Sequence, residues 1–434
     1  MSLQSSVATT RRRWLTIAIH AMSAALASLA GWTTGANAQS DTLRVASAVD
    51  LVHSINPELQ AARLRVDAAR ERIPQAGALP DPMLAFGLMN RPLDGFGTSE
   101  PMTMNTVQLT QRLPWPGKLG FSEDQMEHLA LAQELDADEI ERQLTAGLKA
   151  AYFQLAYVDR ALDVMHNTRE LLRDFQEVSS AKYAVGEGLQ QDVLQAQVAV
   201  AQITEDITVM EQERTAGAAR LNALLGRDAT VPVPALELLG PGGEIAPVDS
   251  LMALAVVGSP ALQAARARGD AADAGYRAAR RKLYPDFTVT LGYGQRPQYT
   301  DMLTIMFGVS IPLWAGRRQL PMRREMAAVQ AGQEARERSL YNETFARVTE
   351  IRARAERAGS LSRLYANSVL PQSRAAVESA LSAYRVGAVD YMTLVANQLT
   401  VNRYEIETVR HAADYQRALA ELEALIGSDI GGGR

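Results

Sequence analysis

Four methionines are the residues whose chemistry is most distinctive, because a thioether sulfur is a soft ligand suited to copper or silver. Met83, Met89, Met102 and Met104 lie within a short stretch of alternating residues. Most methionines on apolar faces serve only as flexible packing groups. The sequence therefore leaves two interpretations open, contact with a soft metal and simple packing.

No residue pattern predicts catalysis. Each histidine downstream of residue 39 lacks a second histidine at the helical spacing of a metal site; these are His53, His128, His166 and His411. Gly292-x-Gly294 lacks the remainder of a dinucleotide fingerprint, and there is neither a phosphate-binding loop nor a serine elbow. We expect a protein that is not an enzyme and has no cofactor or resident metal.

The composition is that of a folded chain. The 434 residues carry a net charge of −5, are 47% hydrophobic and 21% charged, and include no cysteine. Disulfides and thiolate metal sites are therefore impossible, and there is no basic excess for nucleic acid.

Residues 1–38 have the pattern of a secretory signal peptide. Arg11-Arg12-Arg13 precedes an apolar run, and Ala36-Asn37-Ala38 supplies small residues for cleavage before Gln39. A weaker twin-arginine pattern overlaps the same segment. Downstream of residue 40 no apolar run approaches the ~20 residues of a membrane helix. We expect a secreted, periplasmic or β-structured outer-membrane protein.

The remaining chain repeats itself at a spacing near 200 residues. Matching pairs recur in the same order: Asn56-Pro57-Glu58-Leu59 and Ser259-Pro260-Ala261-Leu262, Leu113-Pro114-Trp115-Pro116-Gly117-Lys118 and Ile311-Pro312-Leu313-Trp314-Ala315-Gly316-Arg317, Tyr183-Ala184-Val185-Gly186 and Tyr384-Arg385-Val386-Gly387, and Leu225-Gly226 and Ile426-Gly427. The chain is predicted to contain an internal two-fold repeat.

Each repeat is expected to contain a helix, a hairpin, a long helix and a returning helix. The first repeat spans 39–230, with hairpin 82–113, long helix 118–180 and helix 189–226; a Pro/Gly-rich linker spans 231–247; the second repeat spans 248–428, with hairpin 285–313, long helix 317–383 and helix 388–426; a tail spans 429–434. Pro371 falls inside the second long helix and predicts a kink there.

The long helices carry a seven-residue period, which is typical of coiled coils. One row comprises Leu144, Ala151, Val158, Met165 and Leu172, and a second comprises Leu148, Leu155 and Leu162. At 1.5 Å per residue the first long helix would extend about 90 Å.

The alternating segments have the length of tilted membrane strands, ~9 to 11 residues. Strands in lipid require a closed barrel, which four strands cannot form. Three copies would supply about 12 strands, enough for an open pore. Trp115 and Trp314 occupy the matching strand-to-helix junctions, where they would act as membrane-interface anchors. Capping of a soluble sheet is the alternative.

On these motifs the chain resembles the TolC-like outer-membrane efflux channels over nearly its whole mature length. The resemblance implies a mainly α fold with a membrane β-barrel part: long coiled-coil helices form a periplasmic α-barrel, and four strands per protomer join a 12-stranded trimeric β-barrel. It also implies a homotrimer in outer-membrane lipid that docks onto a periplasmic adaptor and an inner-membrane pump. Leu113–Lys118, Leu370-Pro371-Gln372 and Gly387–Tyr391 are similar to the heavy-metal branch, whose pumps are of the resistance-nodulation-division type.

The resemblance places a periplasmic gate or adaptor-docking site just after the Tyr-x-Val-Gly turns. The candidate residues are Tyr183, Gly186, Asp192, Tyr384, Gly387 and Asp390. Thr393 stands where the second copy of Asp192 would be, which departs from a two-ring acidic gate. Helix capping is the alternative for both aspartates. Two other functions stay open, a duct for type I protein secretion and a soluble periplasmic coiled-coil scaffold.

Overall fold

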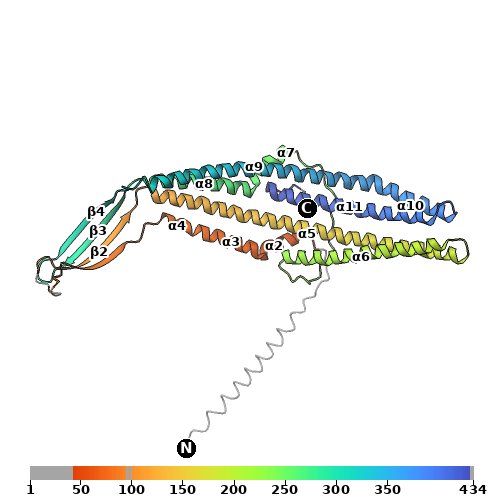
Figure 1. The fold of residues 1–434 in the computed structure, drawn as a ribbon, viewed down its shortest axis with the longest axis horizontal. Coiled ribbons are helices and arrows are strands. Elements are labelled where there is room, and N and C mark those ends of the chain that lie inside the picture. Colours follow the sequence, from red (N-terminus) through yellow and green to blue (C-terminus); the bar gives the residue numbers. More distant parts are fainter. Residues whose placement is uncertain (1–42, 94–96, 98–99, 431–434) are drawn as a thin grey trace, which may run out of the picture. The chain divides into compact units, whose positions relative to one another are not determined.

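The computed structural model describes residues 43–93, 97 and 100–430. The predicted signal peptide, residues 1–38, lies outside the described residues, as do positions 431–434 of the predicted tail. The described part consists of long helices and one four-stranded sheet (Figure 1).

The first repeat begins with three short helices rather than one. These are α2 (Val45–Ile55), α3 (Pro57–Arg70) and α4 (Arg72–Gly77). The break between α2 and α3 lies at Asn56, whose side chain caps α3 by accepting hydrogen bonds from the N–H groups of Glu58 and Leu59. Pro57 favours a helix start because it has no N–H to leave unpaired. The repeat continues with strands β1 (Met83–Met89) and β2 (Met104–Leu113) and helices α5 (Lys118–Ala184) and α6 (Gln190–Leu224).

The second repeat follows the same order. Its elements are α7 (Val248–Gly258), α8 (Pro260–Arg281), β3 (Asp286–Gln295), β4 (Met302–Ser310), α9 (Gln319–Leu364), a π-helical turn (Tyr365–Val369), α10 (Leu370–Arg385) and α11 (Tyr391–Ile426). Between the repeats, the segment 231–247 packs along the helices: Arg214 and Gln416 donate hydrogen bonds to the carbonyl oxygens of Val233 and Gly240.

The heptad positions of α5 form its buried side. Leu148, Leu155, Val158, Met165 and Leu172 are all buried. Helix α5 packs against both α6 and α11, so its apolar stripe joins the two repeats. A buried hydrogen bond of 2.9 Å from Thr168 to Asn402 crosses the same contact.

Pro371, which the sequence predicts to kink or break the helix, follows a local change in the helical hydrogen-bonding pattern. The preceding residues form a π-helical turn in which the N–H of Leu370 bonds to the carbonyl oxygen of Tyr365. Proline cannot donate the next helical bond, and its ring would collide with the carbonyl four residues earlier. The wider π-turn absorbs this defect, so α9 and α10 run on in succession, with helical backbone angles retained at Tyr365 and Leu370.

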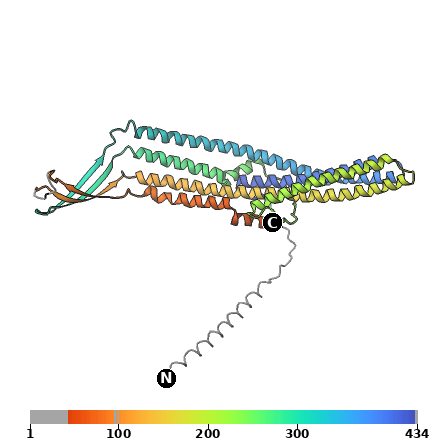
Figure 2. The ribbon, with the colours of Figure 1, turned by 60° about the horizontal axis from the view of Figure 1, so that its bottom comes forward.

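The four strands form one antiparallel sheet in the order β1-β2-β3-β4. The central pair, β2 and β3, joins the two repeats, with Leu109 opposite Leu291. Strands β1 and β4 are the sheet edges. The strands extend from one end of the helices, and the turns between α5 and α6 and between α10 and α11 lie at the other end (Figures 1 and 2).

Within the described part of the chain, no single helix combines the length and the apolar character needed to cross a membrane. Helices α7 and α8 meet those criteria only as a pair, and the pair is bent by 50°.

Candidate functional site

The sheet has one apolar face and one polar face. Because side chains alternate along a strand, the observed register gathers two sets of residues. The apolar face is built mainly from Leu84, Phe86, Leu88, Val107, Leu109, Leu113, Phe287, Val289, Leu291, Tyr293, Leu303, Ile305, Phe307 and Val309. The opposite face includes Thr106, Gln108, Thr110, Arg112, Asp286, Thr288, Thr290, Thr304 and Ser310. Apolar-out and polar-in alternation is the signature of a strand between lipid and an aqueous lumen.

Apolar side chains on the first face are strongly exposed. Phe86 on β1 is 75% exposed and Phe307 on β4 is 80% exposed. An apolar face of this size in water would be highly unfavourable. The sheet is therefore suited to contact with lipid.

The predicted anchors Trp115 and Trp314 lie at the junctions between strands and long helices but differ in environment. Trp115 stacks on Tyr284 and Phe287, with ring centroids 5.2 and 5.6 Å apart. Trp314 is 75% exposed. The two repeats therefore have equivalent tryptophans, and of the two only Trp115 has an aromatic partner among the described residues.

The two Tyr-x-Val-Gly motifs form the turns at the other end of the helices. Gly186 and Gly387 have φ values of 78° and 75°, a left-handed conformation that favours glycine. In the first turn the N–H of Glu187 bonds to the carbonyl oxygen of Lys182, and in the second the N–H of Ala388 bonds to that of Ala383. The sequence repeat thus produces the same helix-ending turn twice.

The end of the helices that carries the two turns is called the tip below. Side chains at the tip link the two repeats. Lys182, in the last turn of α5, places its ammonium nitrogen 4.0 Å from the centroid of the Tyr384 ring. It also donates a hydrogen bond of 3.2 Å to the Tyr384 carbonyl oxygen. Tyr384 in turn packs edge-on against Tyr391. Tyr183, the counterpart of Tyr384, is instead exposed.

The two candidate aspartates have different environments. Asp390 precedes α11 and caps it, because its carboxylate accepts a 2.9 Å hydrogen bond from the N–H of Thr393. Asp192 lies in the first turn of α6 and has no capping bond. Burial raises the pKa of the Tyr391 hydroxyl, and the negative charge of Asp192 adds to that effect. Burial and Asp192 raise the pKa of Tyr384 in the same way. The charge of Asp192 therefore acts on Tyr384 and Tyr391, whereas Asp390 caps its own helix.

Lys182 and Tyr391 are tip residues that sequence reasoning missed. Lys182 immediately precedes the first Tyr-x-Val-Gly motif, but alanine occupies the same place before the second. That difference between the repeats was the available signal. Tyr391 is buried and its hydroxyl has no hydrogen-bond partner among the described residues.

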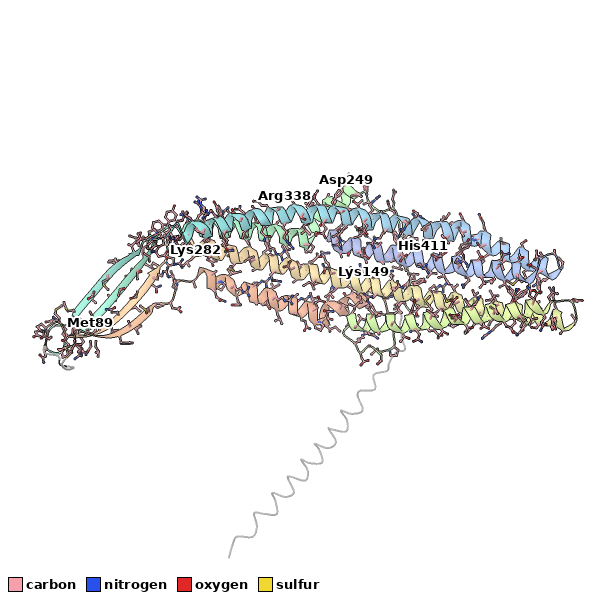
Figure 3. All side chains as sticks on the ribbon, viewed as in Figure 1. Met89, Lys149, Asp249, Lys282, Arg338 and His411 are labelled. Atoms are coloured by element: carbon pink, nitrogen blue, oxygen red, sulfur yellow. The ribbon has the colours of Figure 1, made fainter. Side chains whose placement is uncertain are left out.

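Met89, Met102 and Met104 lie at the hairpin end of the sheet, where Figure 3 labels Met89, whereas Met83 lies at the opposite end of β1, across from Thr110. Met89 pairs directly with Met104 across β1 and β2, and Met83 starts β1 on the same face. Met102 lies just before β2 and is exposed. Across the described residues, no cluster of three or more His, Asp or Glu side chains could hold a metal ion.

The sheet and helices together define a class of protein, the outer-membrane channels whose protomers each contribute a few strands and a pair of helical hairpins. A family comparison agrees: the profile described as outer membrane efflux protein matches residues 48–227 and 251–428. The chain belongs to this family, which confirms the expected fold class, internal repeat, efflux role and outer-membrane location. The two matched segments correspond to the two repeats.

Solved structures share the fold. VceC, an outer membrane protein of Vibrio cholerae, is 16% identical, with 89% of this chain and 97% of that chain covered and a TM-score of 0.75. CusC, described with reference to transmembrane channel formation, is 16% identical over 89% and 92%, with a TM-score of 0.74. The MtrE outer membrane channel of Neisseria gonorrhoeae is 18% identical over 89% of each chain, with a TM-score of 0.72. No curated protein sequence matches this chain.

Proposed function

We propose that this chain is one protomer of a homotrimeric exit duct that receives substrates from a periplasmic adaptor and an inner-membrane pump. The observation that carries the proposal is a sheet with one apolar face, one polar face and two unpaired edges, β1 and β4. In this role the chain is a passive conduit without catalytic activity.

The unpaired edges support assembly from several copies. Backbone groups exposed to hydrocarbon each cost several kcal/mol, so an open four-stranded sheet is unstable in lipid. Pairing β4 of one copy with β1 of the next satisfies both edges. Three copies give about 12 strands, which is enough for an aqueous lumen.

The helical tip supports a gate or docking site at the end remote from the sheet. Tyr183, Gly186, Asp192, Tyr384, Gly387 and Asp390 all lie in or beside the two turns there. The contact between Lys182 and Tyr384 ties one turn to the other within a protomer. We infer that separation of the two turns opens the duct. A periplasmic adaptor would bind the turns, and the adaptor would connect the duct to an inner-membrane pump of the resistance-nodulation-division type.

Heavy-metal cations are the substrate class that we propose first. The support is the pair of thioethers on the polar face at the hairpin end, where Met89 lies opposite Met104. Soft monovalent cations such as those of copper and silver accept thioether ligands. Packing in a crowded loop region is the competing explanation for the same methionines.

The assembly is tested first. Native mass spectrometry of the detergent-purified protein should give a trimer, and planar bilayers should show discrete conductance. A soluble monomer that needs no detergent would overturn the channel and leave a periplasmic scaffold.

Deletion of the gene then tests the substrate class on a panel of metal salts, detergents and antibiotics. Selective metal sensitivity would support heavy-metal export, and broad sensitivity to organic compounds would replace it with multidrug export. Loss of an exported protein without sensitivity would point to a secretion duct.

A further inference from the structure

An ionic cluster around one buried carboxylate joins the two repeats where the sheet meets the helices. Asp286, the first residue of β3, is only 9% exposed. Its carboxylate accepts hydrogen bonds from the guanidinium of Arg112 at 2.8 Å, the ammonium of Lys118 at 2.6 Å and the N–H of Trp115 at 3.0 Å. Three donors on one carboxylate make a strong, directional joint.

The tryptophan completes this joint. The Trp115 ring lies on Tyr284 and Phe287, the residues that flank Asp286 on the second repeat. Lys118 also donates a 2.8 Å hydrogen bond to the Tyr284 carbonyl oxygen. The end of β2 and the start of α5 are thereby fixed to the segment that leads into β3. Figure 3 labels Lys282 in this region, between the helices and the strands.

Most parts of this cluster occur a second time in the chain. The segment from Pro285-Asp286 to Gln295-Arg296-Pro297 is matched by Pro80-Asp81 to Asn90-Arg91-Pro92 at the same spacing, with Gly292 matched by Gly87. Trp115-x-Gly-Lys118 is matched by Trp314-x-Gly-Arg317. Asp81 therefore corresponds to Asp286, and Arg317 corresponds to Lys118.

The second set is incomplete within one chain. Asp81 precedes β1, whereas Trp314 and Arg317 follow β4, and these strands are the two opposite edges of the sheet. Among the described residues, the side chains of Asp81 and Arg317 have no hydrogen-bond or ion-pair partner. The side chains of Asp81, Trp314 and Arg317 are all exposed. An acid, a base and an aromatic ring thus remain without the contacts that their counterparts make.

We propose that the second set closes between protomers, with Asp81 of one copy accepting hydrogen bonds from Arg317 and from the N–H of Trp314 of the next copy. The proposal rests on the trimer of the proposed function. Trp314 would pack on Leu79 and Pro82, which stand at the positions of Tyr284 and Phe287. Each sheet edge would pair with a second copy of this chain. Two observations favour this partner: Asp81 and Arg317 have opposite charges, and their counterparts Asp286 and Lys118 are bonded within the chain.

The same repeat fixes the register between protomers. Leu113 pairs with Phe287 within the chain. The corresponding residues, Ile311 and Pro82, would then lie opposite each other where β4 of one protomer meets β1 of the next. This contact is called the seam below. Continuing along the strands places Phe307 opposite Phe86, both of which point from the apolar face. A shift by one residue would turn one strand's apolar side chains into the lumen, so the apolar faces select this register. The stretch from Ile311 to Trp314 is one residue longer than the stretch from Leu113 to Trp115.

The joint between protomers is expected to be weaker than the joint within each protomer. Ser310 stands at the position of Arg112, so the second cluster has one cation fewer. Trp314 also meets an aliphatic residue and a proline instead of two aromatic rings. The seam is therefore the part of the barrel that should separate first.

Charge reversal tests the pair. Asp81→Arg and Arg317→Asp should each lower the fraction of trimer that survives partial dissociation in detergent, by about two- to fivefold. The double reversal should restore most of it, because the pair is re-formed with exchanged signs. Asp249→Arg with Arg338→Asp is a control pair: both residues are labelled in Figure 3 and lie on the helices, away from the strand junctions.

Cysteine cross-linking tests the register independently, and the absence of native cysteine gives a clean background. Phe86→Cys combined with Phe307→Cys should form covalent trimers on oxidation, since directly opposite Cβ atoms are within disulfide reach. Leu84→Cys with Phe307→Cys is the diagonal control and should cross-link much less. A wild type that is not trimeric would overturn the proposed function. A trimer in which the double reversal gives no recovery, or in which the diagonal pair cross-links better, would overturn only this inference.

Discussion

The ammonium group of Lys182 lies over the ring of Tyr384 and is hydrogen-bonded to the carbonyl oxygen of the same residue. These residues are in the last turns of α5 and α10, so one side chain ties together the helix ends of the two repeats. Nothing equivalent can form from the second repeat, where Ala383 replaces the lysine. Lys182 therefore supplies a polar contact between the two turns, beside the apolar cluster that the helix ends share.

Removal of that cation should loosen the tip. A cation over a tyrosine ring contributes about 0.5–1 kcal/mol at a partly exposed site. Lys182→Met is expected to shift the balance toward the conducting state by about two- to fivefold, measured as open probability in planar bilayers. Arg385→Met is the matched control, since Arg385 is an exposed base in the same turn as Tyr384. Unchanged currents in Lys182→Met would remove the latch role.

Asp390 should stabilise α11 as a cap rather than as a pore charge. Asp390→Asn keeps an acceptor for the Thr393 N–H and loses the charge, whereas Asp390→Ala loses both. We expect the alanine variant to melt at lower temperature and the asparagine variant to remain close to wild type. Circular dichroism during heating measures the difference. If the asparagine variant alone altered cation block of the channel, the charge itself would be functional.

The same cap predicts a pH dependence. The hydrogen bonds from Thr393 lower the pKa of Asp390 below its usual value of about 3.9. A lowered pKa in the folded state means that the unfolded chain takes up the proton first as pH falls. The stabilisation is therefore present at neutral pH and is lost as pH falls through the lowered pKa. Melting temperatures of wild type and Asp390→Ala should converge at that acidic pH and diverge above it.

The two faces of the sheet should respond oppositely to charge. Leu109 and Gln108 are neighbours in the middle of β2 and point to the apolar and polar faces. Leu109→Lys should destabilise the folded protein in lipid by about 2–4 kcal/mol, the range for lysine on a lipid-facing strand near the bilayer midplane. Gln108→Lys should have little effect on folding and instead change ion selectivity. Equal tolerance of both lysines in a vesicle folding assay would contradict the lipid-facing assignment.

The π-helical turn should depend on Pro371. Pro371→Ala restores an N–H donor and removes the ring, so α9 and α10 can join through regular hydrogen bonds. We expect a gain of up to ~3 kcal/mol in stability and slower amide exchange over Tyr365–Val369. Pro321→Ala is the control, because Pro321 lies in the first turn of α9, where its missing N–H costs little. Faster exchange in Pro371→Ala would show that the π-turn has another cause.

Local pattern determined much of this protein. The heptad rows of α5 predicted its buried side, alternation predicted the strands, and the repeated Tyr-x-Val-Gly motif predicted two turns whose glycines have positive φ. These features can be predicted from the sequence because each depends either on a regular spacing of apolar residues or on a backbone angle that few residue types adopt. The family resemblance, confirmed by comparison, rests on the same motifs.

Tertiary structure decided which equivalent residues find partners. The sequence presents Trp115 and Trp314, Asp81 and Asp286, or Tyr183 and Tyr384 as pairs, yet one member of each pair has its contacts within the chain and the other is exposed. For the tryptophans and the aspartates the difference arises because β2 and β3 lie side by side in one protomer whereas β4 and β1 are opposite edges. For the tyrosines it arises because Lys182 contacts Tyr384 and Ala383 stands at the equivalent position of the second repeat. A repeat in sequence fixes local shape, but contacts across long separations depend on which strands and helices become neighbours.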